Sequence, residues 1–195
     1  MRAPTRFTAL LLAAFACTVA NLAQADEALW QGLQRGGYVI LIRHATTVPG
    51  TGDPPGYRLE DCASQRNLSD AGRAEAKRLG QVLRERKVPI GEVRSSLWCR
   101  CLDTAQLAFG KAQAWAPLNS FFDTPNMSGP ATAAVRQHLA NLRPGPDNLV
   151  LVTHQVNISA LTGVYPAMGE MVVLKLDGSR EPKLAGRLTV QHKAQ

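Results

Sequence analysis

Hydrophobic positions along the chain form two kinds of pattern, short continuous runs and runs that recur every three to four residues. The continuous runs lie at residues 38–42, 148–153 and 171–176, and each is flanked by glycine or proline. Such runs are typical of strands buried on both faces of a sheet. Residues 92–95 and 187–190 are shorter strand candidates in which apolar and polar residues are mixed. The pattern predicts strands at all five places.

The segments between these runs have a helical period. Residues 71–85, 98–109 and 131–142 carry apolar side chains three and four positions apart, and a short helix is expected after Asn157. Strands that alternate with helices predict a three-layer α/β/α sandwich with a mainly parallel central sheet. A chain of 195 residues is long enough for one such domain and too short for two ordinary ones.

The first 25 residues are expected to lie outside this domain. Arg2 and Arg6 precede an apolar stretch at residues 7–23, which leads into Ala-Gln-Ala. A basic start, a short apolar middle and small residues at the cleavage site are typical of a secretory signal peptide. The apolar stretch is interrupted and shorter than the roughly 20 residues that a membrane anchor needs. We expect residues 26–195 to form the mature protein, periplasmic or secreted, with no transmembrane segment.

The charge of the chain is modest and dispersed. Its formal charge of +7 comes from 22 basic and 15 acidic residues, which do not gather into tracts. This distribution argues against a dedicated nucleic-acid binder, so no nucleic-acid partner is expected. The net positive charge still favours a small anionic ligand. Charged residues make up only 19% of the chain, below the usual quarter, which excludes a disordered or supercharged protein.

One long segment, residues 48–66, fits neither pattern. It contains three prolines and three glycines, and it directly follows the first predicted strand. A loop of this length in a compact domain is usually functional, and α/β proteins place their ligands at the carboxyl ends of strands. The alternative is a passive surface insertion.

Basic and imidazole side chains lie at the ends of three predicted strands. Arg43 and His44 follow the first strand, His154 follows residues 148–153, and Arg100 lies in the first helical turn after residues 92–95. In a parallel sheet these ends meet at one crevice. Arginines grip phosphate oxygens with two parallel hydrogen bonds, and an imidazole can attack phosphorus. The constellation predicts a phosphoryl-transfer site that needs no metal.

Four motifs in order resemble the histidine phosphatase (phosphoglycerate mutase-like) superfamily. Residues 42–47 resemble its Arg-His-Gly signature, and residues 67–72 resemble its Leu-Thr/Ser-x-x-Gly helix start. Residues 95–105 resemble its second-arginine motif, and residues 152–154 its second-histidine motif. The resemblance covers about residues 37–176 and implies the phosphoglycerate mutase-like fold.

The resemblance also implies roles for individual residues. His44 is the expected nucleophile, with Arg43, Arg100 and His154 forming the phosphate pocket. Arg66 is either a further phosphate contact or a solvated loop arginine. The chain is most similar to small exported members related to the lipopolysaccharide heptose phosphate phosphatase. The implied substrate is therefore a small phosphorylated molecule, such as a sugar phosphate of the cell envelope, and no cofactor is implied.

The acid that protonates the leaving group is not fixed by a motif. Gln155 follows the second histidine, where the acid phosphatase branch has aspartate. Asp123 lies roughly where other branches supply an acid, and we favour it. Asp53, Glu60 and Asp61 in the long loop are the alternatives.

Taken together, these features predict an exported, metal-independent phosphomonoesterase that works through a phosphohistidine. The rival from another class is a catalytically silent module that holds phosphate or phosphoglycans in the same pocket. A mutase is a weaker third possibility, because an exported protein is separated from glycolytic substrates.

Three cysteines follow the predicted signal peptide. Cys99 and Cys101 are two apart on a predicted helix, so they point about 200° away from each other and cannot pair. Cys101 belongs to the apolar stripe of that helix, and Cys62 lies in the long loop near the same crevice. We therefore expect a Cys62–Cys99 disulfide and a reduced Cys101, in a compartment that permits disulfides.

Overall fold

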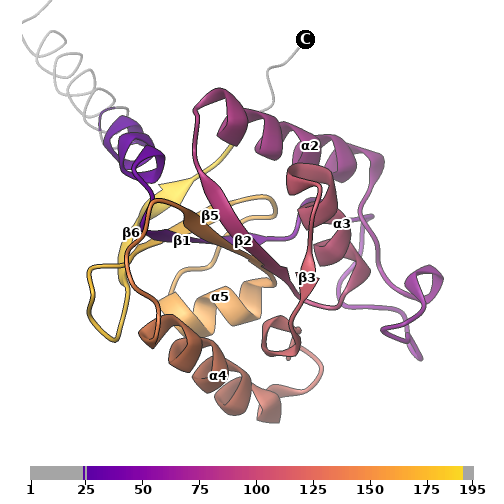
Figure 1. Ribbon diagram of the computed structural model, residues 1–195. Helices are drawn as coiled ribbons and strands as arrows, with labels where there is room; N and C mark the ends of the chain where they lie inside the picture. The colour runs from indigo at the N-terminus through magenta and orange to yellow at the C-terminus, as the bar shows by residue number, and fades with distance from the viewer. Residues whose placement is uncertain (1–23, 25, 191–195) are drawn as a thin grey trace, which may run out of the picture.

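A six-stranded sheet forms the centre of the computed structural model, which describes residue 24 and residues 26–190 (Figure 1). Its strand order is β3-β2-β4-β1-β5-β6. The strands are β1 (Tyr38–Arg43), β2 (Ile90–Ser95), β3 (Gln113–Ala114), β4 (Asn148–Thr153), β5 (Met171–Lys175) and β6 (Lys183–Leu188). The first four strands of this order run parallel, whereas β5 and β6 are antiparallel to their neighbours. The prediction of a mainly parallel sheet is confirmed.

Helices cover both faces of this sheet. On one face lie α2 (Asp70–Glu85), α3 (Cys99–Phe109) and a helix at residues 26–34, and on the other lie α4 (Ser128–Ala140) and α5 (Gln155–Thr162). Short 3-10 helices η1 (Cys62–Ser64), η2 (Ala116–Leu118) and η3 (Pro125–Met127) occur in the connections. The fold is therefore the expected three-layer α/β/α sandwich.

The continuous apolar runs at residues 38–42 and 148–153 form the two central strands. Helices cover both faces of these strands, so the side chains on both faces must be apolar. In β1, Ile40 and Ile42 pack toward α2 and α3, whereas Val39 and Leu41 pack toward α4 and α5. All four side chains are fully buried. Burial of each stabilises the fold by about 1.5–3 kcal/mol relative to exposure. Polar substitution at any of these positions would thus disrupt one helix layer.

The start of α2 lies against the chain segment that follows β1. Ser69 caps the helix, since its Oγ accepts a hydrogen bond from the backbone N–H of Gly72 at 3.1 Å. A Cβ atom on Gly72 would lie 1.8 Å from the carbonyl oxygen of Thr46, so only glycine permits this contact. The Ser-x-x-Gly motif therefore holds α2 against the residues next to His44.

Several element boundaries differ from the sequence-based expectations. β6 begins at Lys183, before the expected residues 187–190, because this edge strand is held by backbone pairing with β5 and its exposed side chains lack an apolar pattern. Helix α4 starts at Ser128 and α5 at Gln155, each before its apolar stripe begins. The helix at residues 26–34 and strand β3 were not expected at all. The predicted signal peptide lies, except for residue 24, outside the described residues.

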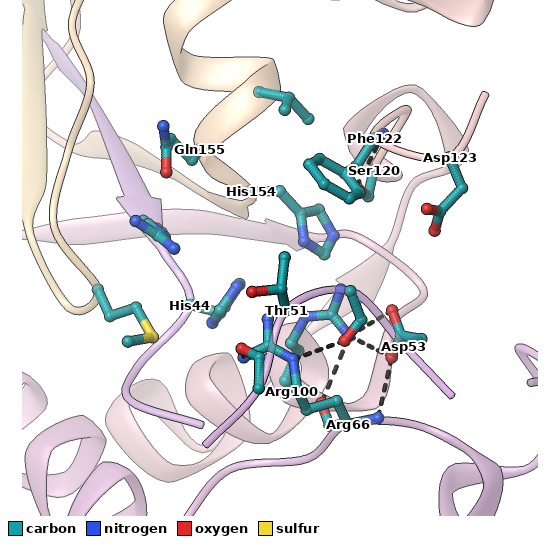
Figure 2. Close-up of a pocket in the computed structure, with 15 residues that line it drawn as sticks. His44, Thr51, Asp53, Arg66, Arg100, Ser120, Phe122, Asp123, His154 and Gln155 are labelled. Carbon is teal, nitrogen blue, oxygen red and sulfur yellow. Dashed lines mark hydrogen bonds and ion pairs between the residues drawn. The ribbon is translucent and has the colours of Figure 1, made fainter. Parts of the chain in front are cut away.

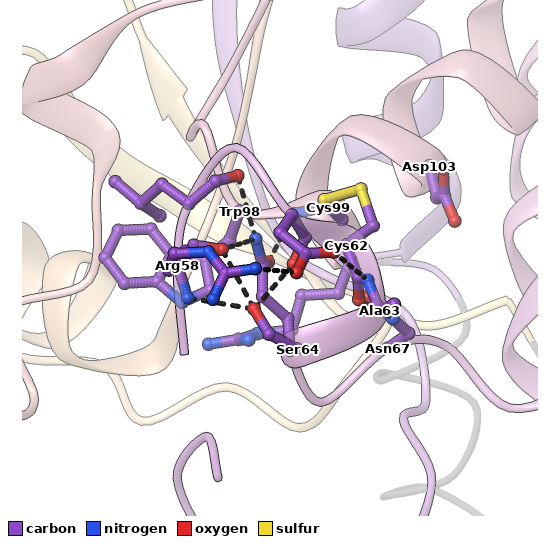
Figure 3. Close-up of a disulfide and its surroundings, with 12 residues drawn as sticks. Arg58, Cys62, Ala63, Ser64, Asn67, Trp98, Cys99 and Asp103 are labelled. Atoms are coloured by element: carbon purple, nitrogen blue, oxygen red, sulfur yellow. Dashed lines mark hydrogen bonds and ion pairs between the residues drawn. A yellow bond between two sulfur atoms is a disulfide. The ribbon is translucent and has the colours of Figure 1, made fainter. Parts of the chain in front are cut away.

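The long loop at residues 48–66 is fixed to the N-terminus of α3 (Figure 3). A disulfide joins Cys62 to Cys99, with 5.6 Å between their Cα atoms, while Cys101 is a buried free thiol. The side-chain oxygen of Gln65 accepts a hydrogen bond from the backbone N–H of Cys99 at 2.9 Å. The expected pairing of the cysteines is confirmed, and the loop is held against α3 by a covalent bond and a hydrogen bond.

Candidate active site

The residues singled out at the strand ends meet in one pocket of about 250 Å³ (Figure 2). His44 follows β1, His154 follows β4, and Arg100 lies in the first turn of α3. The two imidazole ring centres are 5.5 Å apart. Arg43 and Arg66 also line the pocket. The convergence predicted from the parallel sheet is therefore present.

His44 is buried and held in one tautomer. Its side chain belongs to a residue that is only 3% exposed, and its Nδ1 lies 2.9 Å from the carbonyl oxygen of Ala45. A carbonyl oxygen can only accept, so Nδ1 carries the hydrogen and Nε2 of the neutral ring has a free lone pair. Burial lowers the pKa of His44 to about 3, and the nearby arginine charges act in the same direction, against the hydrogen bond to Ala45. The ring is therefore neutral at physiological pH.

His154 is the second buried imidazole. It is 4% exposed, and its Nε2 lies 2.8 Å from Oγ of Ser96 and 3.5 Å from Sγ of Cys101. Burial, followed by the influence of His44 and the arginines, lowers the pKa of His154 well below its usual value. The indole of Trp98 packs edge-on at 5.3 Å between ring centres. These neighbours fix the ring of His154 in the pocket wall.

Three arginines make the pocket strongly positive. Arg43 donates from Nη1 to the carbonyl oxygen of Pro166 at 2.9 Å, and Arg66 donates from Nε to that of Gly52 at 2.7 Å. Burial lowers the pKa of Arg43, and the like charges of Arg66 and Arg100 lower it further. Among the described residues, the buried Nε atoms of Arg43 and Arg100 have no hydrogen-bond partner. An anion bound here would relieve the repulsion and satisfy these donors.

Arg66 is partly buried and is held by several hydrogen bonds within the long loop. It lies in the pocket wall, where its side chain donates hydrogen bonds to the carbonyl oxygens of Gly50 and Gly52 at 3.0 and 2.7 Å. Burial lowers the pKa of Arg66 and the charge of Arg100 adds to this effect, whereas Asp53 opposes it. Arg66 therefore lies in the pocket wall, and its contact with phosphate stays a prediction.

The four candidate acids occupy different environments. Asp123 is exposed at the pocket wall and forms no ion pair with the described residues (Figure 2). Asp53 also lines the pocket, but it is ion-paired to Arg100. Glu60 and Asp61 face Arg58 and do not line the pocket. Asp123 is therefore the candidate carboxylate that lines the pocket without an ion pair among the described residues.

Sequence reasoning missed two polar contacts that join the site together. Thr104 on α3 accepts a hydrogen bond from the backbone N–H of Ala45 at 3.0 Å and donates to the carbonyl oxygen of Arg100 at 2.7 Å. Ser96 contacts His154 from the end of β2. The sequence shows Thr104 four residues after Arg100. It does not show that Thr104 contacts Ala45, because Ala45 lies in another part of the chain.

Comparisons with known proteins agree with this geometry. Residues 39–120 match the family model described as the histidine phosphatase superfamily (branch 1). No curated protein is similar enough in sequence to match the chain. The match covers 82 of the 195 residues, so this part of the chain is similar to the histidine phosphatase superfamily.

Solved structures share the fold at low sequence identity. SixA from Agrobacterium tumefaciens, described as a candidate phosphohistidine phosphatase, is 20% identical, with a TM-score of 0.54 over 80% of this chain and 99% of that one. The protein histidine phosphatase SixA complexed with tungstate is 17% identical, with a TM-score of 0.54 over 78% and 96%. The product of open reading frame Rv3214 from Mycobacterium tuberculosis is 16% identical, with a TM-score of 0.58 over 81% and 100%. These likenesses support the phosphoglycerate mutase-like fold.

The two buried histidines predict that acid destabilises the protein. Unfolded histidine has a pKa near 6.5, whereas that of His44 is about 3 and that of His154 is also lowered. Below pH 6.5 the unfolded chain therefore binds more protons than the folded one. The free energy of unfolding should fall by up to about 1.4 kcal/mol per pH unit for each histidine between pH 6 and 4.

Urea unfolding at a series of pH values measures this effect. A His154→Gln variant should show a shallower fall over the same range, because one of the two responsible imidazoles is absent. A free energy of unfolding that stays constant from pH 7 to 4.5 in the parent protein would contradict the neutral, buried state of both rings.

Proposed function

We propose that the protein is a metal-independent phosphomonoesterase that carries a phosphoryl group on Nε2 of His44. The observation that supports this most directly is the contact between Nδ1 of His44 and the carbonyl oxygen of Ala45 at 2.9 Å. It leaves Nε2 unprotonated, in a pocket where Arg43, Arg66 and Arg100 favour a dianion. A catalytically silent binding module has no need for this tautomer.

In the first step, the arginines and His154 bind the oxygens of a phosphate ester. Nε2 of His44 attacks phosphorus, so that a P–N bond forms while the P–O bond to the leaving group breaks. The fixed guanidinium groups stabilise the charge on the transferring group, which is the main contribution to catalysis in phosphoryl transfer. Asp123, in its protonated form, gives its proton to the departing oxygen.

In the second step, water replaces the leaving group. The carboxylate of Asp123 takes a proton from this water as its oxygen attacks phosphorus and the P–N bond breaks. Inorganic phosphate leaves, His44 returns to its neutral state and Asp123 is protonated again. No step needs a metal ion, and no group of three or more ligand-type side chains in the described part of the chain is placed to hold one.

Export is part of the proposal. The signal peptide pattern at residues 1–25 supports it, and so does the Cys62–Cys99 disulfide, since such bonds persist in oxidising compartments. In the described residues, no helix is both long and apolar enough for a membrane span. The proposed substrate is a small phosphorylated molecule, and a sugar phosphate of the cell envelope is the class that the sequence resemblance favours. Phosphohistidine is the second class to assay, because a structural neighbour is named a protein histidine phosphatase.

Turnover of p-nitrophenyl phosphate by residues 26–195 in the presence of a chelator tests the proposal. We expect release of nitrophenol and, after rapid quenching with labelled substrate, a phosphoprotein that is stable to base and labile to acid. Binding of inorganic phosphate without any turnover would instead support the silent module. Activity that the chelator abolishes would contradict the metal-independent route.

Asp123→Asn tests the proton donor. Alkyl phosphates release basic alkoxides, which are poor leaving groups, so their hydrolysis should slow by about 10²–10³-fold. Formation of the phosphoenzyme from nitrophenyl phosphate should slow less than about 10-fold. Single-turnover kinetics measure the first step separately from the second. Asp103→Asn, a partly exposed carboxylate paired with Arg73 outside the pocket, is the matched control. Equal slowing of both substrate types in the first step would exclude Asp123 as the acid.

A further inference from the structure

Asp53, in the long loop, forms a buried ion pair with Arg100 (Figure 2). The side chains of Asp53 and Arg100 are 2% and 5% exposed. A single nitrogen of the guanidinium, Nη1, lies 2.8 Å from Oδ1 and 3.0 Å from Oδ2 of the carboxylate. One end of the Arg100 guanidinium is therefore committed to the loop and not to a ligand.

The carboxylate of Asp53 is itself held from two further directions. Its Oδ2 accepts a hydrogen bond from the indole Nε1 of Trp98 at 3.0 Å, and its Oδ1 accepts one from the backbone N–H of Arg66 at 2.9 Å. Burial alone would raise the pKa of Asp53, but the hydrogen bonds from Arg100, Arg66 and Trp98 lower it below its usual value. Asp53 is thus a fixed anion and is unsuited to the role of proton donor.

The opposite side of the same guanidinium is left for a ligand. The Nε atom of Arg100 is buried and has no hydrogen-bond partner in the described residues, although Arg100 lines the pocket beside His44 and His154. Guanidinium groups bind phosphoryl oxygens best through two parallel N–H donors of one edge, which requires a fixed orientation of the plane. An anchor at Nη1 supplies that orientation.

We propose that Asp53 is a positioning residue, which fixes the guanidinium of Arg100 so that its Nε edge binds the phosphoryl group. This inference rests on the proposed function, because it assigns Asp53 a part in the same reaction. Asp53 also balances the charge of the pocket. The three arginines carry three positive charges and Asp53 carries one negative charge. With Asp123 protonated, as the proposed first step requires, the net charge of these pocket side chains is +2, which matches a phosphoryl dianion.

An opposite role for Asp53, as an internal plug that competes with phosphate for Arg100, fits the structure less well. To leave, Asp53 would have to break its bonds to Trp98 and Arg66 as well as the ion pair. The loop that carries it is also fixed to α3 by the disulfide. The two roles predict opposite changes in phosphate affinity when the charge of Asp53 is removed.

Binding of inorganic phosphate, measured by calorimetry, provides a test that does not depend on turnover. We expect Asp53→Asn to weaken phosphate binding about 10-fold and to lower kcat/KM for nitrophenyl phosphate about 100-fold, mainly through kcat, since small misplacements of a catalytic group cost about this much. Glu60→Gln, in the same loop but exposed and outside the pocket, should change neither value. Tighter phosphate binding by Asp53→Asn would overturn the proposal in favour of the plug.

A second variant pair separates positioning from a purely structural role. In an Arg100→Lys background, which lacks the guanidinium plane, Asp53→Asn should change phosphate affinity less than about twofold, because nothing remains to be oriented. An undiminished effect in that background would overturn the proposal.

Should Asp53→Asn fail to fold, Asp53→Glu is the variant to test, since it keeps the charge but displaces the anchor. Unaltered phosphate affinity and kcat in Asp53→Glu would then overturn the positioning role. If the parent protein binds phosphate but hydrolyses no ester, the proposed function fails while the binding test of Asp53 remains decisive.

Discussion

Replacement of His44 by alanine is expected to lower kcat for nitrophenyl phosphate by about 10⁴-fold or more, because the group that forms the covalent intermediate is gone. The acid-labile phosphoprotein should disappear as well. Phosphate binding should persist, since the arginines of the pocket remain. Steady-state assays, quench-flow labelling and calorimetry on one preparation measure all three quantities.

The control for this variant is the replacement of a histidine that lies outside the pocket. His138 lies on α4 against the ring of Trp115 and does not line the pocket, so His138→Ala should retain turnover. Residual activity of His44→Ala within tenfold of the parent would rule out the phosphohistidine route. Loss of activity together with loss of helical circular dichroism would instead call for the smaller change His44→Asn.

Removal of the disulfide should produce the largest change in stability. Cys62 and Cys99 are 37 residues apart, and a loop of this length corresponds to about 4 kcal/mol in the chain-entropy account. The variant Cys62→Ser should therefore unfold at a lower urea concentration, with its free energy of unfolding reduced by about that amount. Because the disulfide also fixes the loop that carries Asp53, kcat/KM should fall too.

A reductant provides the matched comparison for this prediction. Dithiothreitol should lower the unfolding midpoint of the parent protein toward that of Cys62→Ser, and it should leave the variant unchanged. Thiol labelling of the unfolded, unreduced parent should report one free cysteine, Cys101, among residues 26–195. Three labelled cysteines without reductant would show that the bond does not form.

The sequence was most informative where burial determines which positions are apolar. The strands β1 and β4 are continuous apolar runs because helices cover both of their faces, so their positions could be predicted almost to the residue. In β6 the side chains are mostly exposed, and backbone pairing with β5 sets its limits instead. Backbone pairing leaves no pattern in the side chains, which is why the predicted start of β6 was late.

The same distinction applies to the site. His44, His154 and Arg100 could be placed together because strand ends in a parallel sheet converge, whatever the details of the side chains. The partners of Asp53 could not, since they depend on the path of a loop that has no period. Asp53 was therefore one of several competing acids in the sequence, and the ion pair with Arg100 gives it a different role.

The two edges of the sheet bear on how the folded protein behaves in a crowded solution. Exposed edge strands are templates for pairing with another chain, and natural proteins limit this with short strands, charged side chains and bulges. Here β3 has only two residues, while β6 carries Lys183 and Arg187 and pairs with β5 through an irregular register. Neither edge offers a long, regular row of free backbone groups, so strand-to-strand association between molecules is disfavoured.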